Sequence, residues 1–225
     1  MSKTIPFESK SGHKDTAEVS EPAGSGKAPA VVLIQEYWGI NDNMKSITDR
    51  MAKEGFLAVT PDLYHGKSTK DAGEAAKMMQ SLDHKQAMED IASAVAFAKS
   101  HPRSNGKVAV LGFCMGGALS FAAAATVPGL SAVVPFYGLP DASKLDLSKI
   151  TAPILGHFGK KDTYFTEDKA KGFVQALEKA GKSVEIHFYD AGHAFANEHR
   201  PEAYDAPSAK LAWERSLAFL RKHLG

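Results

Sequence analysis

The chain has 225 residues, of which 44% are hydrophobic and 24% charged, with 27 Lys and Arg against 26 Asp and Glu. This length predicts one domain, residues 1–225, which buries roughly 70–75% of its unfolded surface without help from disulfides. The balanced charge favours neither nucleic acid nor an anionic membrane surface as a partner, and a single cysteine excludes both an internal disulfide and a cysteine-rich zinc site.

Residues 1–8 contain no apolar stretch long enough for a signal peptide. No apolar run elsewhere in the chain reaches the ~18–20 residues of a transmembrane helix. We therefore expect a cytoplasmic protein with no membrane partner, present as a monomer or a weak homodimer.

The N-terminal part of the chain predicts two short strands, residues 4–8 and 14–20, joined at Ser11-Gly12. The residues that follow, 21–29, are rich in Gly, Pro and Ser, which is typical of a loop or a linker. A surface loop is favoured because the piece before it is too short to fold alone.

Beyond residue 30, apolar runs that suit buried strands alternate with segments whose apolar residues fall at helical spacing. The strands are expected at 30–34, 56–60, 107–111, 131–135, 152–158 and 183–189. The helices are expected from Asn41 or Asp42 to Gly55, in two pieces within 69–101, at 115–126, at 166–180, and from Pro207 onward. This order predicts a doubly wound, mostly parallel sheet between two layers of helices, with its active site at the carboxyl ends of the strands.

One strand-to-helix junction carries the single cysteine of the chain. The sequence Gly112-Phe-Cys-Met-Gly-Gly117 matches the nucleophile elbow, a tight turn that presents one reactive side chain above the sheet. Gly112 and Gly116 are expected there because any Cβ would crowd the turn. The helix that follows directs its positive dipole end at the sulfur, which favours the thiolate. A lone cysteine is more often a small buried apolar residue, but this context favours Cys114 as a nucleophile.

Two further residues follow Cys114 in the order nucleophile, acid, histidine that is found in α/β-hydrolases. Asp162 and His193 both come after predicted strands, at the edge of the sheet where the elbow lies. His193 can accept the thiol proton and return it to the leaving group, while Asp162 orients the imidazole. Alone, Asp162 could be a turn residue and His193 a surface histidine. Together they favour a Cys-His-Asp triad on an α/β-hydrolase fold.

An acyl-transfer site also needs donors for the oxyanion that develops on the substrate carbonyl. We expect them to be the backbone N–H groups of Met115 in the elbow and Tyr37 in the loop after the first buried strand. Trp38 and Tyr137 either pack or line the substrate pocket, with the pocket slightly favoured. Asp62 is interpreted as a turn or capping residue rather than as a catalyst.

Five stretches of the chain together resemble the dienelactone hydrolase (carboxymethylenebutenolidase) family. They are Gln35-Glu-Tyr-Trp-Gly39, Pro61-Asp-Leu-Tyr64, Gly112-Phe-Cys-Met-Gly-Gly117, Gly159-Lys-Lys-Asp162 and Gly192-His193. The resemblance covers nearly the whole chain and implies hydrolysis of an ester or lactone through a thioester, without metal or organic cofactor. It also implies that Glu36 contacts the resting thiol of Cys114 and takes its proton when substrate binds.

The expected substrate-binding positions depart from the family. Members that cleave dienelactone bind its carboxylate with arginines, one of which lies four residues after the triad histidine, where this chain has Asn197. Residues 65–90, which correspond to the segment with another arginine, contain none, and Lys70 is one possible replacement. The residues predicted to contact substrate are Trp38, Lys70, Tyr137, Phe195 and Asn197.

Three functions are compatible with these observations. The first is a dienelactone hydrolase-like enzyme acting on a lactone or small ester. The second is a broad carboxylesterase of the same family with an uncharged acyl pocket, which the missing arginines suggest. The third is a redox-sensing or non-catalytic protein in which Cys114 is oxidised rather than acylated, and the triad order argues against it.

Overall fold

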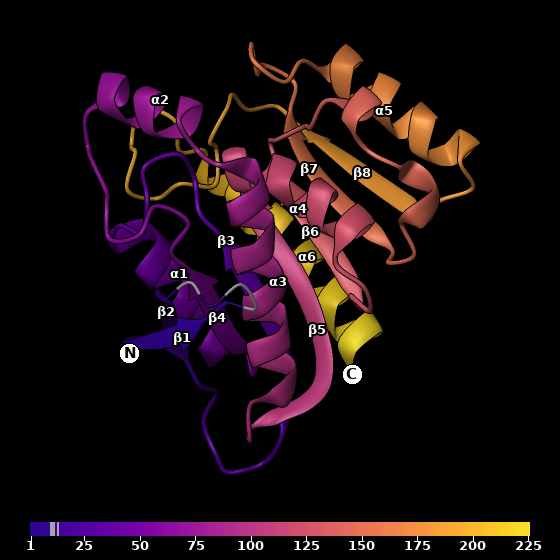
Figure 1. The fold of residues 1–225 in the computed structure, drawn as a ribbon. Helices are drawn as coiled ribbons and strands as arrows, with labels where there is room; N and C mark the ends of the chain where they lie inside the picture. Colours follow the sequence, from indigo (N-terminus) through magenta and orange to yellow (C-terminus); the bar gives the residue numbers. More distant parts are fainter. Residues whose placement is uncertain (10–11, 13) are drawn as a thin grey trace.

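The computed structural model describes residues 1–9, 12 and 14–225 (Figure 1). The strands are β1 (Lys3–Glu8), β2 (Lys14–Ser20), β3 (Ala28–Ile34), β4 (Leu57–Pro61), β5 (Ser104–Phe113), β6 (Ala132–Phe136), β7 (Ile154–Gly159) and β8 (Val184–Tyr189). The α-helices are α1 (Asp42–Lys53), α2 (Ala72–Gln80), α3 (His84–Ser100), α4 (Met115–Thr126), α5 (Glu167–Lys179) and α6 (Ala206–Leu224). Two short 3-10 helices, η1 (Ala142–Lys144) and η2 (Leu147–Lys149), lie between β6 and β7.

The strands form one sheet in the order β1-β2-β4-β3-β5-β6-β7-β8. Strands β3 to β8 are parallel, whereas β2 pairs antiparallel with both β1 and β4. Strand β4 lies on one side of β3 and β5 lies on the other, so the chain first adds strands in one direction and then in the opposite one. This arrangement confirms the predicted doubly wound sheet. The predicted turn at Ser11 falls outside the described residues.

Helices cover both faces of this sheet, and β3 shows why. Its Val32 and Ile34 pack in a core with α3, α4 and α5, whereas Val31 and Leu33 pack in a second core with α1 and α6. Successive residues of a strand point to opposite faces, so a continuous apolar run fits a strand that is buried on both sides. In Figure 1, α3 and α4 lie in front of the sheet and α6 lies behind it.

Side-chain hydrogen bonds to the backbone fix where a helix begins and where the chain turns after a strand. The Asn41 side chain accepts a hydrogen bond from the N–H of Met44 at 3.1 Å and caps α1, as predicted. Asp62 accepts from the backbone N–H groups of Tyr64 and Gly66 at 3.0 and 2.6 Å, which confirms its role as a turn residue. No helix in the described part of the chain is long and apolar enough to cross a membrane.

Candidate active site

Cys114 lies between β5 and α4 with φ 55° and ψ −115°, a strained conformation for a residue with a side chain. Close backbone contacts hold it there. A Cβ on Gly112 would lie 2.1 Å from the carbonyl oxygen of Gly116, and a Cβ on Gly116 would lie 2.3 Å from that of Ile34. Both positions therefore require glycine, and the packing that they permit joins the start of α4 to the end of β3. The geometry confirms the predicted elbow.

His193 bridges the other two members of the predicted triad. Its Nε2 lies 3.2 Å from Sγ of Cys114, and its Nδ1 lies 2.8 Å from Oδ2 of Asp162. The second carboxylate oxygen of Asp162 accepts from the backbone N–H groups of Tyr164 and Phe165 at 2.8 and 3.0 Å. The ends of β5, β7 and β8 thus bring together three side chains in the geometry of a nucleophile, a base and an orienting acid.

The electrostatics of the three groups follow from this geometry. Burial disfavours the ionised form of Asp162, but the hydrogen bonds from His193 and from two backbone N–H groups outweigh it and lower the pKa of this carboxyl. Burial likewise disfavours imidazolium, yet the Asp162 carboxylate and the Cys114 sulfur raise the pKa of His193 to about 10. The protonated imidazole is thus favoured at His193, with the sulfur of Cys114 as its neighbour at 3.2 Å.

Three aromatic rings surround the imidazole of His193. The ring centroids of Tyr137, Tyr164 and Phe165 lie 5.2, 5.3 and 5.8 Å from it. Tyr164 is 68% exposed, which places an aromatic surface at the open side of the site. Neither Tyr164 nor Phe165 was among the predicted site residues, although the aromatic pair that begins two residues after Asp162 was a usable signal.

Glu36 is buried, and both of its carboxylate oxygens have hydrogen-bond donors. Its Oε2 accepts a hydrogen bond from Nδ2 of Asn197 at 2.5 Å, and its Oε1 accepts from the hydroxyl of Tyr137 at 3.5 Å. The contact of Glu36 with the resting thiol, which the resemblance implies, stays a prediction, and the sulfur of Cys114 lies 3.2 Å from Nε2 of His193. Burial raises the pKa of Glu36, although the hydrogen bond from Asn197 and the nearby charge of His193 act in the opposite direction.

A groove of about 480 Å³ opens at Trp38 and Asn197, and none of Cys114, Asp162 and His193 is among the residues that line it. It is lined by Trp38, Asn41, Asp42, Asn43, Thr69, Lys70, Ala72, Asn197, His199, Arg200 and Glu202. Three of the five residues predicted to contact substrate, Trp38, Lys70 and Asn197, thus lie on it. The other two, Tyr137 and Phe195, are fully buried and pack together with ring centroids 5.4 Å apart, so neither lines the groove.

Arg200 of the groove was not among the predicted contact residues. Its guanidinium carbon lies 5.2 Å from the ring centroid of Trp38, and its Nη2 pairs with Glu202 at 2.7 Å. The positive charge also reaches the triad region, since it lowers the pKa of Glu36 in opposition to burial. Arg200 is therefore a second cation, besides Lys70, within reach of a ligand in the groove.

The two predicted oxyanion donors lie in segments that touch. Met115 is the first residue of α4, and Tyr37 follows Glu36 in the loop after β3. The close approach of Gly116 to Ile34 brings these segments together. The Tyr64 hydroxyl donates to Sδ of Met115 at 3.3 Å, which fixes that side chain.

The strand order, the elbow and the helices on both faces define an α/β-hydrolase fold. The model of the dienelactone hydrolase family matches residues 16–224. The chain is 32% identical over 231 residues to a carboxymethylenebutenolidase of Pseudomonas putida, covering 98% of this chain and 96% of that protein. It is 36% identical over 234 residues to the protein named Usf of Aquifex pyrophilus, over the full length of both.

A solved structure agrees with these relatives. The crystal structure of a Klebsiella pneumoniae protein provisionally named a dienelactone hydrolase superposes with a TM-score of 0.88 at 28% identity, covering 97% of each chain. The chain belongs to the dienelactone hydrolase family. It is a hydrolase of lactones or carboxylic esters, as the sequence resemblance implied.

Proposed function

We propose that this hydrolase cleaves a lactone or small carboxylic ester through a thioester on Cys114, with His193 as general base and acid and Asp162 as the orienting residue. The proposal rests on the two contacts of the His193 imidazole, from Nε2 to Sγ of Cys114 at 3.2 Å and from Nδ1 to Oδ2 of Asp162 at 2.8 Å. The same arrangement raises the pKa of His193 to about 10, which favours the charged pair needed for attack.

In the acylation step the Cys114 thiolate attacks the carbonyl carbon of the ester. A C–S bond forms, and the π electrons of the carbonyl move to its oxygen. The N–H groups of Tyr37 and Met115 are proposed to donate hydrogen bonds to this oxyanion. When the intermediate collapses, the ester C–O bond breaks and the leaving alkoxide takes the proton of the His193 imidazolium.

Deacylation returns the enzyme to its starting state. The neutral imidazole of His193 takes a proton from water as the water oxygen attacks the thioester carbonyl. The C–S bond then breaks, which releases the carboxylic acid and restores the thiolate beside a protonated His193. These steps use only protein groups and water. A lactone substrate would leave as a single hydroxy acid.

Glu36 enters this scheme through the loop that carries Tyr37. Its hydrogen bonds to Asn197 and Tyr137 fix the residue directly before the proposed oxyanion donor. A role in accepting the thiol proton, as the family resemblance implies, would require Glu36 to leave these partners when substrate binds. The raised pKa of Glu36 suits it to accept a proton, because a general base works best when its pKa lies near the operating pH.

Replacing the nucleophile tests the proposal. Cys114→Ala should abolish hydrolysis of an aryl ester, and Cys114→Ser should retain only a small fraction of it while folding equally well. Unchanged ester hydrolysis in Cys114→Ala would contradict the thioester mechanism and leave oxidation of the thiol as the better account of this residue.

A second candidate keeps the chemistry but prefers uncharged esters, and one observation favours it. The position of the expected arginine is occupied by Asn197, which is buried against Glu36, and the nearby Arg200 is engaged by Glu202. Among the described residues that line the groove, Lys70 is then the one Lys or Arg side chain without an ion pair. Side-by-side kcat/KM values for dienelactone and a neutral aryl ester separate the two candidates, because a wide preference for the neutral ester excludes dienelactone-type specificity.

A further inference from the structure

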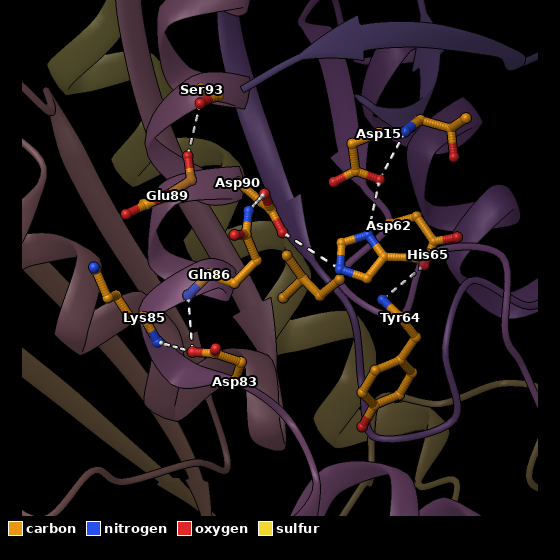
Figure 2. A network of polar contacts seen from close by, with 12 residues as sticks. Asp15, Asp62, Tyr64, His65, Asp83, Lys85, Gln86, Glu89, Asp90 and Ser93 are labelled. Atoms are coloured by element: carbon orange, nitrogen blue, oxygen red, sulfur yellow. Dashed lines mark hydrogen bonds and ion pairs between the residues drawn. The ribbon is translucent and has the colours of Figure 1, made fainter. Parts of the chain in front are cut away.

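A second cluster of ionisable side chains lies where β2, the turn after β4, and α3 meet (Figure 2). Its members are Asp15 on β2, His65 in the turn and Asp90 on α3. One candidate ligand atom from each residue lies within 4.8 Å of the other two. None of the three belongs to the triad or lines the groove at Trp38 and Asn197, and the proposed ester hydrolysis does not use them.

Asp15 has a buried carboxylate oxygen without a hydrogen-bond donor among the described residues. Its Oδ1 accepts from the backbone N–H of Thr16 at 2.7 Å and lies 3.5 Å from Nδ1 of His65. Its Oδ2 is buried and has no hydrogen-bond donor in the described part of the chain. The Asp15 side chain is only 1% exposed, and Figure 2 shows this oxygen turned toward Asp90. A buried carboxylate oxygen without a donor is costly, which points to a missing ligand.

Further carboxylates increase the negative charge around this atom. Asp90 is fully buried, with Oδ1 bound to Nε2 of Gln86 at 2.7 Å and Oδ2 lying 3.9 Å from Nε2 of His65. Asp62 lies near but has both oxygens occupied by backbone N–H groups. Asp15 and Asp90 repel each other when both are ionised, because both are buried away from water. A cation placed between Asp15 and Asp90 would offset this repulsion.

We propose that Asp15, His65 and Asp90 bind a divalent transition-metal ion such as Mn²⁺ or Zn²⁺. Two carboxylates and an imidazole are a mixed oxygen and nitrogen donor set that suits these ions, whereas Ca²⁺ and Mg²⁺ prefer oxygen alone. Metal–ligand bonds of about 2.0–2.2 Å require the three donor atoms to draw somewhat closer together than they are here. His65 is the member best able to make this movement, because its side chain is 39% exposed whereas Asp15 and Asp90 are buried.

The ion would have a structural role and would not contact the reacting atoms. It would join the antiparallel edge of the sheet to α3 and to the turn that carries His65. Tyr64, the preceding residue in that turn, contacts Sδ of Met115 in the elbow at 3.3 Å. Metal binding would therefore stabilise a segment that packs against the elbow. Binding of the ion does not depend on the proposed catalytic mechanism.

A metal-free alternative uses the same contacts. A protonated His65 could bridge Asp15 and Asp90, one carboxylate at each ring nitrogen, at the observed 3.5 and 3.9 Å. Such a bridge needs no ion and leaves Oδ2 of Asp15 unsatisfied. Uptake of metal by the cluster separates the two accounts.

The test uses the untagged full-length chain with Cys114→Ala as the parent, so that the triad thiol cannot compete for metal. After treatment with a chelator, Mn²⁺ is titrated by electron paramagnetic resonance of the free ion, and Zn²⁺ by equilibrium dialysis. We expect one ion per chain and a rise in Tm on saturation. Asp15→Asn and His65→Gln should each weaken binding at least tenfold and remove the rise in Tm.

Glu89→Gln is the matched control, because it removes a carboxylate from α3 one residue before Asp90 and outside the cluster. It should bind metal like the parent. His65 is partly exposed, so His65→Gln keeps the test valid if Asp15→Asn fails to fold. The absence of binding for both ions at millimolar concentration would overturn the proposal. So would binding that survives His65→Gln.

Discussion

Asn197 donates a hydrogen bond of 2.5 Å from Nδ2 to Oε2 of Glu36, and both residues are buried. The bond joins the loop after β3 to the loop after β8, two segments that lie 161 residues apart in the chain. Asn197 was predicted from the sequence to contact substrate. Asn197 does line the groove, but its amide is committed to Glu36, so it is placed to position the glutamate as well.

Loss of this amide should destabilise the fold through Glu36. Asn197→Ala leaves a buried carboxylate oxygen without its donor, so the free energy of unfolding should fall by about 1–3 kcal/mol. The measurement is urea denaturation at neutral pH. The same substitution made in Glu36→Gln should cost less, because the charge-assisted part of the bond is already lost. Equal costs in the two backgrounds would show that Asn197 acts independently of Glu36.

Glu36→Gln tests the second role proposed for the glutamate. Burial raises the pKa of Glu36 in the folded state, so its ionisation reduces stability as pH rises through the folded value. Glutamine removes this penalty, and the variant should be at least as stable as the parent at neutral pH. If Glu36 takes the thiol proton, single-turnover acylation should slow much more than substrate binding weakens. An unchanged acylation rate would leave Glu36 with a positioning role alone.

Two glycine substitutions test the elbow against a matched helix position. Gly116→Ala in α4 places a Cβ 2.3 Å from the carbonyl oxygen of Ile34, so it should destabilise the fold by about 1–3 kcal/mol or more and reduce activity. Gly172→Ala in α5 meets nothing within 4 Å and should be neutral or stabilising by up to about 1 kcal/mol. Thermal unfolding of both variants measures the contrast. Similar Tm values for the two would mean that the elbow tolerates expansion.

The pKa of His193 predicts a pH dependence of stability. The pKa is 6.5 for a free histidine and about 10 in the fold, so protonation is favoured in the native state. The resulting stability is fully present below pH 6.5 and is lost as pH rises through 10. The difference in unfolding free energy between the parent and His193→Gln should therefore shrink over this range. A constant difference would rule out a strongly raised pKa.

The sequence predicted most of the fold because its signals are local. The apolar run of β3, the cap at Asn41 and the glycines around Cys114 each determine the structure at their own position. The 3-10 helices η1 and η2 were not predicted, because three-residue turns show no periodicity. The β5 strand extends from Ser104, before its predicted start at Lys107, because it includes polar residues as well as the apolar run.

Some contacts of the candidate site follow from the order of the strands, and others do not. Cys114, Asp162 and His193 meet because parallel strands end at one edge of the sheet, a rule that requires no side-chain detail. The partners of Glu36 depend on which rotamer its buried side chain adopts, and sequence spacing does not specify that. The cluster of Asp15, His65 and Asp90 comes from three separate elements whose pairing is fixed only by the folded edge of the sheet.

The central claim is that Cys114 carries the acyl group during turnover. The direct measurement is rapid acid quenching of the enzyme with an ester substrate, followed by mass spectrometry of the intact chain and its peptides. The mechanism predicts a mass increase equal to the acyl group on the peptide that contains Cys114, with formation and decay fast enough to account for kcat. Steady turnover with no adduct on Cys114, or with an adduct on another residue, would contradict it.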